Sequence, residues 1–407
     1  MEGRCDSLRG QRVGVLVHAT AQSFALLAAL DRLACDVFLI SGDLSPLSAM
    51  ALGRAYQLSA TIEGDLIERL PDGMPGSGQS TVTILTSGTT GVPKAARHTW
   101  SSLARPVRTG GDVGGANWML CYRPELYAGL QVTLQCFANG GTLVVPAAGQ
   151  TASEVARLGR DNEVTFISAT PSYWRWLLTL GDREILRSWR LRQITLGGEA
   201  VDQRILDQLA ACFPSARLIH IYATTELGRC FSVNDGKAGF PARFLEQASP
   251  DGVALRLEDG ELLVRSANAM RGYDVLSVQA EADADWFHTG DLVERRGDRC
   301  VFVGRQAERI NVGGNKVNPL RVEEVVQSVE GVRDARVYGK TSSIVGQLVA
   351  CEIVVDDGRD AARVLEAVRA ACSDALAVHE RPRIINVVDR MSLSRAGKKL
   401  RSGSHDG

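Results

Sequence analysis

The sequence has no surplus of either charge. Its 46 Lys and Arg residues face 47 Asp and Glu residues, which gives a formal charge of -1. Proteins that hold nucleic acid or an anionic membrane by electrostatic attraction need a basic excess or a basic run. The charge balance disfavours both classes, so we expect partners that are small molecules and no nucleic acid.

Long apolar runs are missing as well. No stretch approaches the roughly 18 uncharged apolar residues that a membrane-spanning helix requires, so no membrane span is predicted. The first residues, Met1 to Asp6, carry charges where a secretory signal would need an apolar core. We therefore expect a cytoplasmic protein.

Metal-binding patterns are also absent from the sequence. The nine cysteines, an odd number, are scattered without a CxxC pair, and the six histidines show no metal-ligand spacing. We expect the cysteines to be buried reduced thiols. A structural zinc site is not predicted.

What the sequence does contain is a regular alternation of helical and strand patterns. A chain of 407 residues with 45% hydrophobic content is long enough for two or three domains. The alternation over residues 12–221 predicts an α/β fold with a largely parallel sheet, and short strands after Gly236 predict a small β subdomain. We predict a large N-terminal α/β domain at 1–305 and a small α+β domain at 306–407.

The stretch from Thr86 to Lys94 follows residues 80–85, an alternating run that predicts a strand. Its glycines let the backbone approach an anion, its N–H groups and hydroxyls can donate to the anion's oxygens, and its lysine adds charge. We predict a polyphosphate cradle, although the composition alone also fits a surface loop and the Walker spacing is absent. The predicted phosphate contacts are Thr86, Ser87, Gly88, Thr89, Thr90, Gly91 and Lys94.

Three later strands end in polar, turn-forming sequence, at residues 169–172, 197–199 and 222–226. The carboxyl ends of parallel strands meet at one edge of a sheet, and ligands of α/β proteins bind there. We expect these three segments to line a site.

Five motifs occur in the order and rough spacing of a known family, namely 86–94, 222–226, 289–291, 304–305 and 397–398. With them the chain resembles the adenylate-forming superfamily of acyl-CoA synthetases, peptide-synthetase adenylation domains and luciferases, over nearly all of residues 12–401. The resemblance implies a mobile C-terminal domain. It also implies an enzyme that joins a carboxylic acid to AMP from ATP, releases pyrophosphate and transfers the acyl group to a thiol.

The resemblance assigns roles around the α-phosphate. The loop 86–94 holds the β- and γ-phosphates, with Lys94 at the departing pyrophosphate. Thr225 donates to the α-phosphate, and Glu226 binds Mg²⁺, a hard cation that prefers oxygen ligands. Taken alone, a pair such as Thr225 and Glu226 is more often just a capping pair at a helix start. Lys398 bridges the substrate carboxylate and the α-phosphate, unless residues 398–401 form a solvated basic tail.

The nucleoside contacts follow from the same resemblance. Tyr222 lies against adenine, and Gly198 and Glu199 approach the adenine edge, where an ordinary tight turn is the alternative. Asp291 accepts from the two ribose hydroxyls, as an ionised carboxylate can. Arg305 lies near the ribose and the phosphates.

The acyl and thiol sites are also assigned by resemblance. The predicted acyl-pocket residues are Tyr127, Gly129, Tyr173 and Gly197. Gly313, Gly314 and Lys316 belong to the loop that shapes a thiol tunnel, and Ala307 occupies the hinge position. Aromatic residues in this region could line an aryl or medium acyl pocket, but aromatics at such spacing also fit a core.

The chain departs from the family pattern at four places. The usual histidine or aromatic residue before Gly129 is missing, Ala223 replaces a glycine, and Ala307 replaces the usual hinge aspartate or lysine. Only 85 residues precede Thr86, fewer than the family has. In the region where peptide-synthetase domains pair an amino group, only Glu125 could substitute for aspartate, which disfavours an α-amino acid substrate.

These observations predict an ATP- and Mg²⁺-dependent acid–thiol ligase. Its substrate would be an aryl or medium acyl acid, and its acceptor would be coenzyme A or the phosphopantetheine of a carrier protein. One alternative is an adenylation enzyme that delivers an amino or aryl acid to a carrier protein only. Another is a regulatory relative that binds nucleotide or acyl ligand with weak catalysis.

Overall fold

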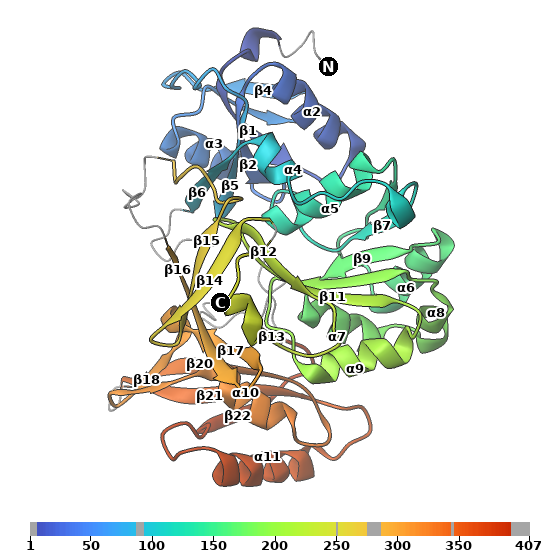
Figure 1. Cartoon of the computed structure of the whole chain (residues 1–407), viewed down its shortest axis with the longest axis vertical. Coiled ribbons are helices and arrows are strands. Elements are labelled where there is room, and N and C mark those ends of the chain that lie inside the picture. The colour runs from blue at the N-terminus through green and yellow to red at the C-terminus, as the bar shows by residue number, and fades with distance from the viewer. Residues whose placement is uncertain (1–5, 87–92, 250, 275–285, 343–345, 392–407) are drawn as a thin grey trace. The chain divides into compact units, whose positions relative to one another are not determined.

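The computed structural model describes residues 6–86, 93–249, 251–274, 286–342 and 346–391, with its elements labelled in Figure 1. The chain forms two compact units. Unit 1 comprises Met1–Lys237, Ala248–Ala254 and Arg265–Trp286, and unit 2 comprises Ala238–Gln247, Leu255–Val264 and Phe287–Gly407. The predicted domain boundary after Arg305 stays a prediction.

Unit 1 begins with a six-stranded sheet in the order β4-β3-β1-β2-β5-β6. Its four inner strands are parallel, and β4 and β6 are antiparallel edges. The strands are β1 (Arg12–Val17), β2 (Asp36–Ser41), β3 (Ala60–Glu63), β4 (Leu66–Arg69), β5 (Thr81–Thr86) and β6 (Lys94–His98). The helical segments are η1 (Asp6–Leu8), α2 (Ala21–Arg32), α3 (Pro46–Ala55) and α4 (Trp100–Ala104).

A second six-stranded sheet follows in unit 1, in the order β12-β11-β10-β9-β7-β8. The strands are β7 (Asn117–Leu120), β8 (Thr142–Val144), β9 (Phe166–Ala169), β10 (Gln193–Gly197), β11 (Arg217–Thr224) and β12 (Gly228–Val233). Its helical segments are η2 (Gly111–Val113), α5 (Tyr127–Ala138), α6 (Ala152–Asp161), α7 (Pro171–Leu180), α8 (Arg183–Ser188) and α9 (Gln203–Cys212). Only β12 is antiparallel to its neighbour.

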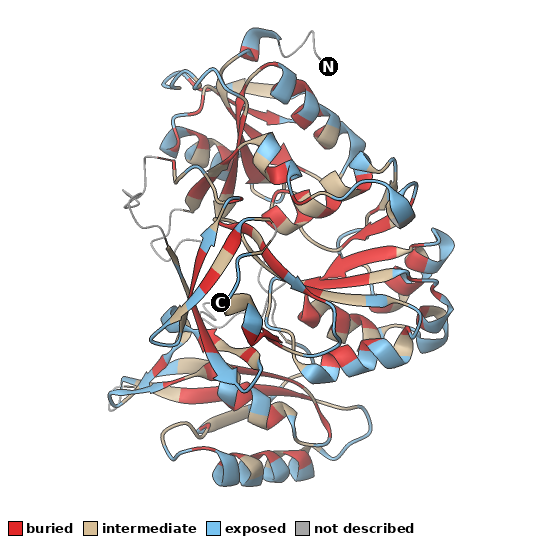
Figure 2. Ribbon diagram, in the orientation of Figure 1, coloured by how far each residue is buried: buried red, intermediate tan, exposed pale blue. Residues whose placement is uncertain are grey.

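The alternation of helices and strands therefore builds two sheets where the sequence predicted one. Helix α5 joins their cores, because Leu130 packs among residues of the first sheet while Val132 and Cys136 pack among residues of the second. Figure 2 shows the buried residues concentrated along the strands of each sheet. Helix α5 therefore packs against both sheets of unit 1.

Unit 2 contains the predicted β subdomain and the C-terminal α+β fold. The subdomain sheet has the order β13-β17-β16-β15-β14, with β13 (Phe240–Pro241), β14 (Val253–Glu258), β15 (Glu261–Ser266), β16 (Phe287–Arg296) and β17 (Arg299–Arg305), and with η3 (Ala242–Leu245). Asp259 and Gly260 both have positive φ angles, 49° and 80°, as a two-residue hairpin turn between β14 and β15 requires.

The C-terminal sheet of unit 2 has the order β19-β18-β21-β20, and β22 pairs with β21. Its elements are η4 (Gln306–Glu308), β18 (Ile310–Val312), β19 (Asn315–Val317), α10 (Pro319–Gln327), β20 (Val332–Ser342), β21 (Gly346–Val355), α11 (Ala361–Ala375) and β22 (Ile384–Val387). Valines of both helices, such as Val322 and Val368, pack with the sheet in one core. The mixed α/β fold class is thereby as predicted.

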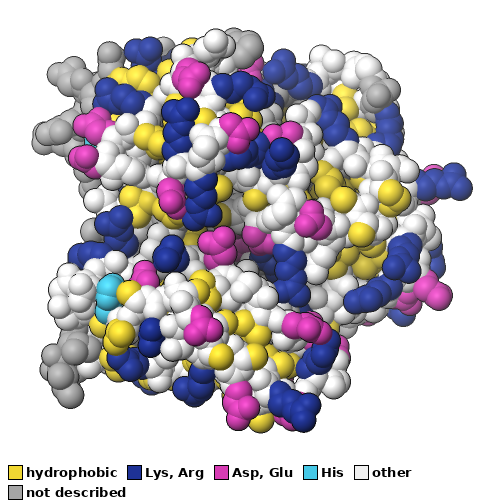
Figure 3. Space-filling model, turned by 60° about the horizontal axis from the view of Figure 1, so that its bottom comes forward, with side chains coloured by type: hydrophobic (Ala, Val, Ile, Leu, Met, Phe, Trp, Pro, Cys, Tyr) yellow, Lys and Arg dark blue, Asp and Glu magenta, His cyan; other side chains and the backbone are white. Residues whose placement is uncertain are grey.

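The described surface carries both charges, as the composition suggested. Figure 3 shows Lys and Arg side chains interspersed with Asp and Glu across one face. Within the described residues, no helix is long and apolar enough to cross a membrane. Six of the eight cysteines in the described ranges are buried, and Cys121 and Cys212 are intermediate.

Candidate active site

The predicted phosphate loop starts and ends on paired strands of the first sheet. Thr86 ends β5 opposite Lys94, which begins β6, and the Thr86 hydroxyl donates to the Lys94 carbonyl at 3.4 Å. The Tyr56 hydroxyl donates to the carbonyl of Pro93. The loop therefore leaves the carboxyl end of β5, as predicted. Five predicted contacts lie outside the described residues, namely Ser87, Gly88, Thr89, Thr90 and Gly91.

A buried carboxylate anchors the base of this hairpin. Asp36 is 1% exposed, and its side chain accepts from the Thr81 hydroxyl at 2.7 Å and from Ser77 at 2.8 Å. Arg97 of β6 pairs with it at 3.3 Å. Because a buried charge must be paired and hydrogen-bonded, this network holds β5 and β6 to the centre of the sheet.

Lys94 and Glu226 both contact the same aromatic residue, Tyr273. The Lys94 ammonium lies 5.5 Å from the centre of the Tyr273 ring, which is within the range of a cation–π interaction. The Tyr273 hydroxyl donates to Glu226 Oε1 at 3.1 Å. Two residues that the sequence assigned to pyrophosphate and to Mg²⁺ are thus joined by a third that the sequence did not single out.

The turn at Thr225 and Glu226, between β11 and β12, rests on a buried histidine. His98 of β6 is 1% exposed, and its Nε2 lies 2.7 Å from the Thr225 carbonyl oxygen, so Nε2 carries the proton and donates. Among the described residues, its buried Nδ1 has no hydrogen-bond partner. Burial lowers the pKa of His98, against smaller opposing effects of Thr225 and Glu226. His98 is therefore a neutral support beneath the turn.

The three predicted strand ends belong to neighbouring strands, since β9, β10 and β11 are adjacent. Gly197 ends β10, and its carbonyl accepts from the Tyr122 hydroxyl at 3.1 Å. Gly198 has a φ of 85°, which favours glycine. The Glu199 carboxylate accepts from both the backbone N–H and the hydroxyl of Ser172, at 2.9 and 3.0 Å. Glu199 thus binds the first turn of α7.

Tyr222 lies near the carboxyl end of β11. Its ring stacks on Phe231 of β12, with ring centroids 5.2 Å apart and planes 24° apart. The pairing of β11 and β12 is irregular between Tyr222 and Ala223, and such bulges re-aim side chains. The irregularity thus falls at the residue where the chain departs from the family glycine.

The predicted acyl-pocket residues surround the start of α5 and α7. Tyr127 is buried, and its ring lies 6.2 Å from that of His98. Gly129 packs so tightly that a Cβ would collide with the Arg123 carbonyl. Burial raises the pKa of Tyr173, which lies beside Cys121, and it raises the pKa of the Cys121 thiol to about 12. Both groups therefore stay neutral near pH 7.

Glu125 is committed to a neighbouring arginine. It is 5% exposed, and its Oε1 accepts from Arg123 Nε at 2.6 Å. Arg123 also pairs with Asp43, which follows β2, at 2.8 Å. A carboxylate that is already neutralised by a guanidinium offers little attraction to a substrate ammonium group.

In unit 2, Asp291 and Arg305 face each other across β16 and β17. Arg305 Nε donates to Asp291 Oδ1 at 2.6 Å. Asp291 is 7% exposed, and its backbone N–H donates to the Thr289 hydroxyl at 3.0 Å. Gly290 has a φ of 69° and donates to Glu261 at 2.8 Å. Asp291 and Arg305, predicted nucleotide residues from two separate motifs, are therefore brought together.

The predicted thiol loop of unit 2 is a hairpin tip. Gly313 and Gly314 have φ angles of 56° and 92° and connect β18 to β19. The Gly314 N–H donates to Asn311 Oδ1 at 3.2 Å, and Lys316 is exposed. Ala307 lies in the short helix η4 and is exposed as well. Lys398 lies outside the described residues.

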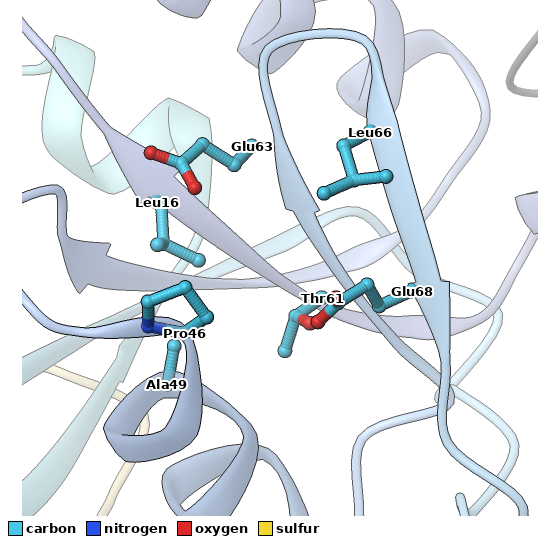
Figure 4. Close-up of a pocket in the computed structure, with 7 residues that line it drawn as sticks. All are labelled: Leu16, Pro46, Ala49, Thr61, Glu63, Leu66 and Glu68. Atoms are coloured by element: carbon cyan, nitrogen blue, oxygen red, sulfur yellow. The ribbon is translucent and has the colours of Figure 1, made fainter.

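A separate small pocket lies beside the edge of the first sheet. Figure 4 shows its lining, made by Leu16, Pro46, Ala49, Thr61, Glu63, Leu66 and Glu68. None of the predicted site residues lines this pocket, so we assign it no role in the reaction.

Sequence reasoning missed Tyr273 and His98, the two residues that support the turn at Thr225 and Glu226. Both contacts are remote in sequence, because Tyr273 lies 47 positions from Glu226 and His98 lies 127 positions from Thr225. A tyrosine after Arg271-Gly272 is a visible sequence feature, but nothing local indicates its partner.

Comparison with known proteins connects this geometry to one family. A family model described as AMP-binding enzyme matches residues 9–274, and one described as AMP-binding enzyme C-terminal domain matches residues 321–398. The chain is 32% identical over 332 residues to a probable 2-succinylbenzoate–CoA ligase of Mycobacterium tuberculosis (strain ATCC 25618 / H37Rv), which covers 78% of this chain and 82% of that protein. It is 27% identical over 349 residues to a salicylyl-CoA synthase / salicylate adenylyltransferase of Streptomyces sp, which covers 80% and 62%.

Solved structures agree in fold. An anthranilate CoA ligase in complex with anthranoyl-AMP superposes with a TM-score of 0.79 at 17% identity and covers 98% of this chain and 88% of that one. An o-succinylbenzoate coenzyme A synthetase from Bacillus subtilis, in complex with ATP and a magnesium ion, gives a TM-score of 0.72 at 20% identity over 100% and 91%. These matches confirm the predicted fold class.

Proposed function

The chain belongs to the AMP-binding enzyme family, and we propose that it activates an aryl carboxylic acid as an acyl-adenylate and transfers the acyl group to coenzyme A. It is an AMP-forming acid–thiol ligase. The observation that carries the assignment to this site is that Lys94 contacts the ring of Tyr273 while Glu226 accepts from its hydroxyl. This arrangement supplies one cationic and one anionic group beside the predicted phosphate loop.

The residues present fit Mg²⁺·ATP. Mg²⁺ is held in such enzymes by one or two carboxylates together with substrate phosphates, so a single carboxylate at Glu226 suffices. When bound, Mg²⁺ would offset the charge that develops on the phosphates. Lys94 would add charge at the pyrophosphate, and Thr225 would donate to the α-phosphate. Thr86 begins the loop that would enclose the phosphates.

We assign the nucleoside contacts as the family resemblance predicts. Asp291 would accept from the ribose hydroxyls, and Arg305 would hold that carboxylate in place through its 2.6 Å hydrogen bond. Gly198 and Tyr222 would lie at the adenine. Glu199 would act there by fixing the end of β10 to α7 through Ser172, because its carboxylate accepts from that helix start.

An aryl acid is the substrate class that the comparisons favour. Relatives of the chain include ligases of 2-succinylbenzoate, of salicylate and of 2-hydroxy-7-methoxy-5-methyl-1-naphthoate. Tyr127, Gly129, Tyr173 and Gly197 would line the pocket for the ring. The pairing of Glu125 with Arg123 argues against an α-amino acid, because no free carboxylate from this segment would meet an ammonium group.

The thiol acceptor is the second part of the proposal. Named relatives are coenzyme A ligases, and we propose the same acceptor here, with Gly313, Gly314 and Lys316 at its tunnel and with a hinge near Ala307. A carrier-protein phosphopantetheine is the alternative, and one relative is a ligase of medium- and long-chain fatty acids to an acyl-carrier protein. Lys398 would act in the adenylation step.

The test is a two-stage assay. The first stage measures pyrophosphate release with hydroxylamine trapping over a panel of aryl, fatty and amino acids, and the second adds coenzyme A or a phosphopantetheinylated carrier protein. We expect an aryl acid to give trapped hydroxamate and then an aryl-CoA. If no acid of the panel causes release of pyrophosphate, the proposal is overturned. Thioester formation on the carrier alone would favour the alternative acceptor.

A further inference from the structure

A short segment of unit 1 connects the strand after the phosphate loop to the turn that holds Glu226. Within residues 270–274, Tyr273 forms an antiparallel bridge with Ala96 of β6. The N–H of Met270 donates to the backbone carbonyl of Glu226 at 2.7 Å. The segment therefore bonds through its backbone to both sides of the candidate site.

The side chain of Tyr273 makes two further contacts from this position. Its ring lies under the Lys94 ammonium at 5.5 Å, and its hydroxyl donates to Glu226 Oε1 at 3.1 Å. The backbone bonds of the segment do not need either contact, because they involve main-chain atoms only. The side chain is thus available to orient charged groups and is not required to hold the segment.

The hydroxyl acts on a flexible carboxylate. A glutamate side chain on a turn loses rotamer freedom when it is held in one position, and a hydrogen bond to one carboxylate oxygen holds it before a cation arrives. The phenol hydroxyl is the donor of this hydrogen bond, so it fixes the position of the carboxylate oxygen that it contacts.

We propose that Tyr273 is a positioning residue for the adenylation step, with its hydroxyl orienting Glu226 for Mg²⁺ and its ring orienting Lys94 for the departing pyrophosphate. The proposal rests on the proposed function, which places Mg²⁺ and pyrophosphate at these two residues. In this proposal the hydroxyl of Tyr273 acts on Glu226 and its ring acts on Lys94. Different substitutions of Tyr273 can therefore remove the hydroxyl alone or the hydroxyl and the ring together.

Tyr273→Phe removes the hydroxyl and keeps the ring. We expect the Mg²⁺ concentration that gives half-maximal pyrophosphate release to rise about tenfold, which corresponds to about 1.4 kcal/mol, while the rate at saturating Mg²⁺ stays close to that of the wild type. Tyr273→Leu removes the ring as well, and we expect an added rise of about threefold to tenfold in the KM for ATP, because a cation–π contact of this kind is worth about 1 kcal/mol.

Two controls accompany these variants. Tyr338→Phe removes another tyrosine hydroxyl that lies 3.5 Å from a glutamate oxygen, that of Glu352 in unit 2, and should leave the Mg²⁺ dependence unchanged. Thiol transfer from a supplied acyl-adenylate needs neither Mg²⁺·ATP nor pyrophosphate. It should proceed at the wild-type rate in both Tyr273 variants.

The outcomes separate the two proposals. Absence of pyrophosphate release by the wild type would overturn the proposed function and this inference with it. An active wild type with an unchanged Mg²⁺ dependence in Tyr273→Phe would overturn the inference alone. Equal losses in adenylation and in thiol transfer, with a lower melting temperature, would also overturn it, because they would show a structural role only.

Discussion

At the scale of single residues, the candidate site depends on side chains that hydrogen-bond to the predicted site residues and fix their positions. Tyr273 holds Glu226, His98 holds the carbonyl of Thr225, and Arg305 holds Asp291. Each of these contacts pairs a residue that the sequence predicted, or its neighbour, with a support from another strand or segment. Such supports set the geometry of an active site to within the small tolerances that catalysis needs.

His98 makes one of these supports sensitive to pH. Its folded-state pKa is lower than the ordinary value of 6.5 because it is buried, so the folded protein resists protonation and the unfolded chain does not. The contribution of neutral His98 to the free energy of unfolding is fully present above pH 6.5. It is lost as the pH falls below 6.5, by at most about 1.4 kcal/mol per pH unit. We expect His98→Gln, which keeps a donor for Thr225, to show a smaller fall in melting temperature between pH 7 and pH 5. An equal fall in melting temperature between pH 7 and pH 5 in the wild type and in His98→Gln would contradict this.

At the scale of elements, the packing of α5 against the preceding loop is the tightest feature near the predicted acyl pocket. A Cβ at Gly129 would collide with the backbone carbonyl of Arg123, and a backbone atom cannot rotate away as a side chain can. The first turn of α5 therefore requires glycine at this position. Helix α7 begins with the Thr170 cap and Pro171, and Glu199 also accepts from Ser172 in its first turn.

We expect Gly129→Ala to lower the free energy of unfolding by about 1–3 kcal/mol and to reduce pyrophosphate release, since Tyr127 lies in the same turn. The matched control is Gly114→Ala, because Gly114 has a φ of -62° and no atom lies within 4 Å of its added Cβ. Chemical denaturation of both variants checks the difference. Equal stabilities would show that the loop at Arg123 moves to accept the methyl group.

The elements that sequence reasoning predicted well are those with local signals. Helices α7 and α11 each begin at a capping residue and follow a helical period, which are signals carried by the local sequence. Strand β6 was not predicted, since the pairing of Lys94 with Thr86 spans the loop and leaves no local pattern. The division into two sheets was missed for a similar reason, because the periodicity of hydrophobic residues does not indicate which strands pair with one another.

At the scale of the whole molecule, the family and its chemistry were predictable because several separated motifs had to agree. Lys94, Glu226, Asp291 and Arg305 all lie in the described residues, where Lys94 and Glu226 contact Tyr273 and Arg305 donates to Asp291. Their assigned roles stay predictions. Tyr273 and His98, which support Glu226 and Thr225, could not be predicted, because their contacts join segments far apart in the chain.

Lys398 tests the division of the reaction into two steps. We expect Lys398→Ala to lower adenylate formation by about a hundredfold or more, since a fixed positive charge beside a developing anion is worth several kcal/mol. Transfer from a supplied acyl-adenylate to the thiol should remain within a few-fold of the wild type. Separate assays of the two half-reactions check this, and an equal loss in both would contradict it.

The central claim is that the carboxylate of the substrate attacks the α-phosphate of ATP. An acid that gives turnover can be labelled with ¹⁸O in both carboxylate oxygens and converted to its thioester, after which the phosphate-containing products are analysed by mass spectrometry. We predict one ¹⁸O atom in AMP and none in pyrophosphate, because the oxygen that bridges carbonyl and phosphorus leaves with AMP. Unlabelled AMP, or label in inorganic phosphate, would contradict the account.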